Sequence, residues 1–204
     1  MCAVLLLVGL SQHLNLNIVS MERSMTRKIY TQGCFDGACF LYSVANCYSA
    51  LTGKPVSQAS WDRAIANVPF LQNFMGNQGT EEIEENILMC ILDNFLKDLP
   101  GKHTFKIKKE SKATLSKAIT KDSVAIFAIK GNTDNQKDLD HWACGVGMQN
   151  KSIMVACSWI GYDKNNYTED KDPQTDRYYN DTITLNPAIV EDAIYSIKYS
   201  KNKD

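Results

Sequence analysis

Residues 32–53 read QGCFDGACFLYSVANCYSALTG, and this stretch decides the fold. A polar, glycine-bearing loop over residues 32–37 leads into residues 38–52, where apolar side chains recur at helical spacing on every side. A helix that is apolar all round is a buried helix. The pattern therefore predicts a central buried helix over residues 38–52, with Asp36 as its N-cap and Gly53 as its stop.

The remaining pattern places helices before a sheet along the chain. Helical spacing predicts further helices over residues 57–68, 80–97 and 112–120, and Thr80 is the expected cap of the second of these. Alternating or continuous apolar runs predict strands over residues 104–108, 124–129, 139–148, 152–158, 182–185 and 193–199, with a hairpin joining the third and fourth. Residues 161–181 carry six acidic and three basic side chains and predict a long surface loop. Helices followed by antiparallel strands predict an α+β fold.

Composition limits the classes of protein to which the chain can belong. Its 204 residues suit one domain. Lys and Arg number 22 against 23 Asp and Glu, so no basic field attracts nucleic acid, and no nucleic-acid partner is expected. The seven cysteines cannot all pair in disulfides because their number is odd. Their scattered positions favour a reducing compartment.

The first ten residues, MCAVLLLVGL, are apolar but short. A spanning helix needs about 20 such residues, so no membrane span is expected. The run contains no basic residue and is followed by no small-residue cleavage site, so it is not expected to direct secretion. We expect residues 1–24 to be a leader or extension. Residues 25–204 should form one domain, helical over about 25–121 and sheet over about 122–204.

Cys39 is the strongest candidate for a nucleophile. It falls in the first turn of the buried helix, where backbone N–H groups and the helix dipole stabilise a thiolate, the nucleophilic form. Gln32 lies upstream in the loop, and its amide is the expected donor to an oxyanion. Among three histidines, His141 lies early in a predicted buried strand and is the expected base. Only the fold can bring Cys39 and His141 together.

These residues resemble a known family. Gly37-Ala38-Cys39-Phe40 resembles the nucleophile signature of papain-like cysteine proteases. Gln32-Gly33 resembles the Gln-Gly of the family's oxyanion hole. His141 opens a strand that ends in Val146-Gly147, as the family's histidine strand does, and Ser158-Trp159 is similar to the Ser-Trp of its Asn-Ser-Trp-Gly segment.

The resemblance covers two short segments. It is nearest to the compact peptidases and bacterial effector or toxin amidases of this clan. It implies a papain-like fold in which the nucleophile helix packs on a C-terminal antiparallel sheet. It also implies a thiol hydrolase that needs no cofactor, acts on a protein or peptide, and works in the cytoplasm or after delivery into a reducing host cytosol. Oligomeric state is left open.

The position of the family's orienting Asn or Asp is occupied by another residue. Counting back from Ser158-Trp159 gives Cys157, and a cysteine is a poor acceptor for an imidazole N–H. Ser158, or Asp163 in the following loop, is an alternative for the same role. The site can also work as a dyad of Cys39 and His141.

Three functions follow from these residues. The preferred hypothesis is hydrolysis of an amide bond, as a cysteine peptidase or glutamine deamidase, through a Cys39–His141 thiolate–imidazolium pair and a thioester. The sequence does not choose between peptide cleavage, side-chain deamidation and acyl transfer. The second hypothesis is a catalytically impaired papain-like binding module, motivated by Cys157. The third is a zinc site built from Cys34, Cys39, His141 and Cys157.

Overall fold

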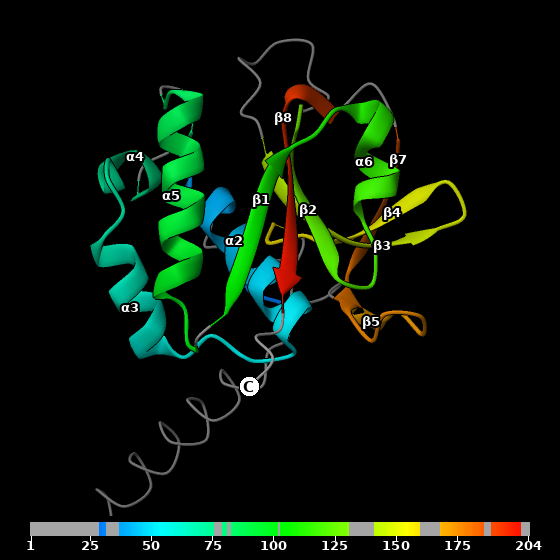
Figure 1. Ribbon diagram of the computed structural model, residues 1–204, viewed down its shortest axis with the longest axis horizontal. Helices are drawn as coiled ribbons and strands as arrows, with labels where there is room; N and C mark the ends of the chain where they lie inside the picture. Colours follow the sequence, from blue (N-terminus) through cyan, green and yellow to red (C-terminus); the bar gives the residue numbers. More distant parts are fainter. Residues whose placement is uncertain are drawn as a thin grey trace, which may run out of the picture.

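The computed structural model combines helices with an antiparallel sheet, as the sequence predicts (Figure 1). The structure describes residues 29–31, 37–75, 79–80, 83–101, 103–130, 141–159, 168–185 and 189–200. The predicted leader over residues 1–24 lies outside these ranges.

The helices and strands follow the predicted order closely. The helices of the described residues are α2 (Cys39–Thr52), α3 (Gln58–Ala66), α4 (Leu71–Met75), α5 (Glu85–Asp98) and α6 (Lys112–Ala118). Their strands are β1 (Thr104–Lys109), β2 (Ser123–Ile129), β3 (His141–Gln149), β4 (Ser152–Ala156), β5 (Asp170–Lys171), β6 (Tyr178–Tyr179), β7 (Asp181–Thr184) and β8 (Ile189–Ser200).

Helix α2 is the predicted central helix, and most of its length is buried. It ends at Gly53, which adopts the left-handed conformation (φ 67°) and donates its N–H to the Ser49 carbonyl, so the predicted stop is confirmed. The predicted cap is wrong, because the N-cap residue is Ala38 and not Asp36. Ala38 has no side-chain oxygen, so its side chain donates and accepts no capping hydrogen bond at the start of this helix.

Among the described residues, six strands form one sheet in the order β1-β8-β2-β3-β4-β7, with antiparallel pairing throughout. The C-terminal strand β8 lies between β1 and β2, so the chain returns to the interior of the sheet rather than to its edge. Strand β1, which corresponds to the strand predicted over residues 104–108, is an edge strand. The β3–β4 hairpin is confirmed, and its turn contains Asn150 at a positive φ of 56°.

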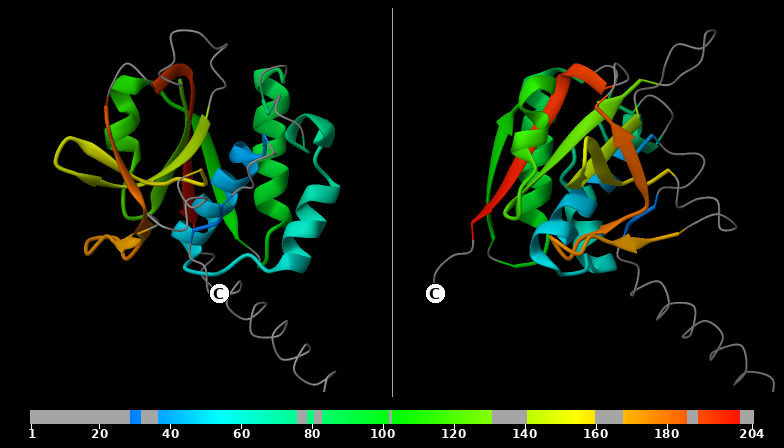
Figure 2. Two further views of the ribbon diagram at one scale, coloured as in Figure 1. Left: turned by 180° about the vertical axis from the view of Figure 1, so that it is seen from behind. Right: turned by 90° about the vertical axis from the view of Figure 1, so that its right-hand side faces the viewer.

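The sheet has a core on each of its faces. The larger core packs α2 and α5 against one face, with Phe40, Leu92 and Phe95 among its members. The smaller core packs α6 against the other face through Leu115. Figure 1 shows α3, α4 and α5 on one side of the sheet and α6 on the other, and the left view in Figure 2, seen from behind, shows the same layers with the two sides exchanged.

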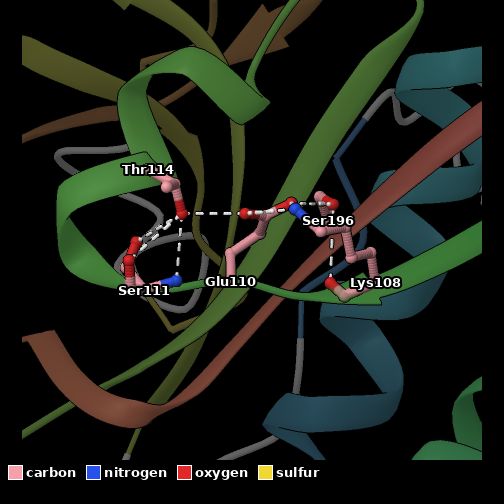
Figure 3. Close-up of polar contacts among 5 residues, drawn as sticks. All are labelled: Lys108, Glu110, Ser111, Thr114 and Ser196. Carbon is pink, nitrogen blue, oxygen red and sulfur yellow. Dashed lines mark hydrogen bonds and ion pairs between the residues drawn. The ribbon is translucent and has the colours of Figure 1, made fainter.

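A buried carboxylate attaches α6 to the sheet (Figure 3). Only 7% of the Glu110 side chain is exposed. Its oxygens accept hydrogen bonds from Thr114 Oγ1 in α6 at 2.8 Å and from Ser196 Oγ in β8 at 2.9 Å. Lys108 Nζ of β1 lies 3.1 Å away. Glu110 therefore joins the start of α6 to the two strands at this end of the sheet.

Three details differ from the sequence-based expectation. The helix predicted over residues 80–97 begins at Glu85, and Thr80 does not cap it. The Thr80 hydroxyl instead accepts a hydrogen bond from Trp142 Nε1 of β3 at 2.8 Å. Helix α4 was not expected, and the predicted loop over residues 161–181 contains the paired strands β5 and β6.

Candidate active site

The fold brings the His141 end of β3 against the N-terminus of α2. Cys39 is the first residue of α2, and its side chain is buried. The backbone N–H of Trp142, the residue after His141, donates to Cys39 Sγ across 3.5 Å. The nucleophile candidate and the strand that carries the base candidate are therefore in direct contact.

The first residues of β3 are fixed to α2 by more than one bond. Ser43, one helical turn after Cys39, donates its hydroxyl to the Trp142 carbonyl at 2.9 Å. Both polar groups of the Trp142 backbone are therefore held by one face of α2. The Trp142 ring packs edge-on against Phe40 with centroids 4.9 Å apart. These contacts set the position of His141 relative to Cys39.

The imidazole of His141 has a sulfur partner. Its Nε2 lies 3.1 Å from Cys157 Sγ, which belongs to the residue after β4. The Trp159 ring lies edge-on to the His141 imidazole, with 6.2 Å between the ring centroids. Burial lowers the pKa of His141 to about 4, so the ring is neutral at neutral pH. This burial opposes the imidazolium form of the predicted ion pair and favours a neutral base.

Cys157 is held in turn by Asn180, which lies between β6 and β7. The Cys157 N–H donates to Asn180 Oδ1 at 2.8 Å, and Asn180 Nδ2 donates to the Cys157 carbonyl at 2.9 Å. The Asn180 backbone N–H donates to the Val155 carbonyl. Sequence reasoning missed Asn180, because an amide in a polar loop carries no local signal of this role.

The other predicted site residues are only partly described. Ser158 is fully buried beside Cys157. Gln32 and Asp163, the expected oxyanion donor and an alternative orienting residue, lie outside the described residues, as does Cys34. The described site is thus Cys39, His141 and Cys157, with Trp142, Ser43 and Asn180 holding them in place.

The zinc hypothesis finds no support in the described part of the chain. There, no group of three or more His, Cys, Asp and Glu side chains is arranged to hold a metal ion. Cys39, His141 and Cys157 are all described, and they do not form such a group.

Comparison with models of protein families gives no match, and comparison with curated proteins gives none either. No helix within the described ranges is long and apolar enough to cross a membrane.

Proposed function

We propose that the chain is a papain-like thiol hydrolase that acts on an amide bond of a protein or peptide. One observation carries the proposal: the backbone nitrogen of Trp142 lies 3.5 Å from Cys39 Sγ, so the residue next to His141 contacts the thiol. The contact of His141 with Cys157 supports it, because Cys157 occupies the position in which the family's motif has its orienting residue.

The chemistry begins with the neutral imidazole of His141. It accepts the proton of the Cys39 thiol as the sulfur attacks the carbonyl carbon of the substrate. The negative charge that develops on the carbonyl oxygen is stabilised by the Cys39 backbone N–H and the Gln32 amide. The intermediate collapses with loss of the amine, which takes the proton from His141. Water then hydrolyses the thioester, which restores the thiol.

The proposed role of Cys157 is to orient the base. A ring that accepts a proton from Cys39 at Nδ1 carries its own proton on Nε2, and this N–H then points at Cys157 Sγ. Sulfur is a weak acceptor, so the ring is held less firmly than by an amide or carboxylate oxygen. Cys157 is a positioning residue whose own place depends on Asn180.

A second candidate function is a binding module on the same scaffold without activity. The observation that favours it is the sulfur of Cys157 in the orienting position. Under this alternative, Cys39 is an ordinary buried thiol. The two candidates therefore predict different reactivity for Cys39.

The test is alkylation of the full chain with iodoacetamide near pH 6, with the adducts mapped by mass spectrometry. The exposed thiol of Cys90 serves as an internal reference. We expect Cys39 to react at least about tenfold faster than Cys90, because the neutral His141 imidazole accepts the thiol proton as the sulfur attacks, and this advantage should disappear in His141→Ala. Equal and slow labelling of both thiols would contradict the hydrolase and favour the binding module. Any turnover of a peptide substrate that is lost in Cys39→Ala would exclude the binding module.

A further inference from the structure

A second pair of thiols lies outside the candidate active site. Cys47 is in α2, about two helical turns after Cys39, and Cys144 is in β3. Both side chains are fully buried in the core between helix and sheet. Their Sγ atoms are 2.8 Å apart, whereas non-bonded carbon atoms pack at about 3.5–4.0 Å. The two side chains therefore point directly at each other across the α2–β3 interface.

We propose that Cys47 and Cys144 are a modification site, at which an intrachain disulfide forms when the chain folds in the presence of a small disulfide oxidant such as oxidised glutathione. The bond would tie the nucleophile helix to the histidine strand. It needs little rearrangement, because α2 and β3 are already held together by the contacts of Trp142 with Cys39 and Ser43. The inference does not depend on the proposed hydrolase activity.

The reaction is a thiol–disulfide exchange in two steps. One protein thiolate attacks a sulfur of oxidised glutathione, which breaks that S–S bond, forms a mixed disulfide and releases one glutathione. The second protein thiolate attacks the protein sulfur of the mixed disulfide, forms the Cys47–Cys144 bond and releases the second glutathione. Two protein sulfurs are oxidised, one glutathione disulfide is reduced, and the two thiol protons end on the released glutathiones.

The structure also indicates when the bond forms. Both sulfurs are enclosed by the core, so a glutathione molecule cannot approach them in the folded chain. Burial also raises the pKa of Cys47, which keeps it in the unreactive thiol form. Exchange is therefore expected during folding. Whether Cys47 and Cys144 are oxidised or reduced in the folded chain then depends on the redox conditions of the compartment in which it folded.

The test follows the pair through refolding. The full chain is reduced and unfolded in guanidinium chloride, then refolded either with mixed reduced and oxidised glutathione or with dithiothreitol. Free thiols are blocked with N-ethylmaleimide in denaturant. Digestion with trypsin and chymotrypsin then separates Cys47 from Cys39, because Phe40, Leu41 and Tyr42 lie between them. We expect a linked Cys47–Cys144 peptide only in the glutathione sample.

Thermal unfolding gives a second measurement. A disulfide that closes a loop of this length, with its cysteines 97 positions apart, is expected to raise the melting temperature by about 10 °C over the reduced protein. The increase should vanish in Cys144→Ala and persist in the matched control Cys90→Ala. Adding oxidised glutathione to the folded, reduced protein should give the linked peptide at least about tenfold more slowly than refolding does.

Two results would overturn the inference. The first is that Cys47 and Cys144 both carry N-ethylmaleimide after refolding with glutathione, in protein whose circular dichroism matches the reduced form. The second is that either cysteine is linked to a different cysteine. Rapid oxidation of the folded protein would overturn the claim that the bond forms during folding.

Discussion

Two cysteine residues contact the start of β3, and they differ in what holds them. Cys39 is fixed by its place at the start of α2, and its sulfur accepts the Trp142 N–H. Cys157 is in irregular backbone and is fixed by the paired hydrogen bonds of Asn180. The contacts around the start of β3 are thus set by one helix terminus and one amide side chain.

The first prediction concerns the sulfur that faces His141. Cys157→Ala removes the contact with Nε2, so the ring is free to turn away from Cys39. Loss of the contact that orients a metal-binding histidine commonly lowers activity ten- to a hundredfold, and by the same reasoning we expect Cys39 alkylation at pH 6 to slow by about tenfold. Cys157→Asn supplies an amide oxygen as acceptor and should at least restore the wild-type rate. The measurement is the rate of iodoacetamide incorporation at Cys39.

Cys144→Ala is the matched control, since it removes another buried thiol near the site without touching His141's ring nitrogen. It should leave the Cys39 rate within about twofold of wild type. An unchanged rate in Cys157→Ala would show that the sulfur does not orient the base.

At the scale of elements, one arginine joins segments that are far apart in the sequence. Arg177 precedes β6 and is 4% exposed. Its guanidinium donates to the carbonyl of Ala50 in α2, to that of Val146 in β3, and to carbonyls at the start of β2 and in the turn before it. A planar group with five N–H donors suits this task better than any other side chain.

The second prediction is that Arg177→Met destabilises the fold strongly. The methionine fills part of the space but leaves several buried carbonyls without a donor, which costs about 3–5 kcal/mol of the free energy of unfolding. Denaturation with urea, followed by circular dichroism, measures the loss. Arg63→Met on the exposed face of α3 is the matched control and should change stability by about 0.5 kcal/mol or less. Equal effects of the two substitutions would contradict this role for Arg177.

Sequence patterns predict those helices and strands that are stabilised by residues close together in the chain. The apolar residues on every side of α2 and the helical spacing over residues 57–68 predict helices α2 and α3, and the structure shows that Ser57 caps α3. The position of β8 between β1 and β2 was not predictable, because strand order depends on contacts between distant segments. The local pattern predicts Thr80 as a cap, and it cannot reveal the observed partner, the Trp142 ring, because that ring comes from a distant strand.

The candidate site was also predictable only where its residues lie in a local sequence pattern. The motif around Cys39 and the start of the strand at His141 both show in the sequence, and the structure places them in contact. Asn180 and Arg177 were missed because they fall in a stretch whose many charges indicate a surface loop. Both act on backbone groups of other segments, and such partners leave no pattern of their own in the sequence.

For the whole molecule, burying a neutral histidine makes the stability of the fold depend on pH. Burial lowers the pKa of His141 to about 4 in the folded chain, while an unfolded chain has an ordinary value of about 6.5. Above pH 6.5 neither state binds a proton at this ring. Between about pH 6.5 and 4 only the unfolded state does, so stability is lost as the pH falls through this window.

The third prediction is a loss of about 2 kcal/mol in the free energy of unfolding between pH 7 and pH 5 from His141 alone. His141→Gln keeps a polar side chain but does not titrate. Between pH 7 and pH 5 its free energy of unfolding should therefore fall by about 2 kcal/mol less than that of wild type. Urea denaturation at the two pH values gives both differences. Burial also lowers the pKa of His103, so the comparison is repeated in a His103→Gln background to remove that contribution. Identical pH dependence of wild type and His141→Gln would mean that His141 is not buried as a neutral ring, and the neutral base in the proposed mechanism would then lose its support.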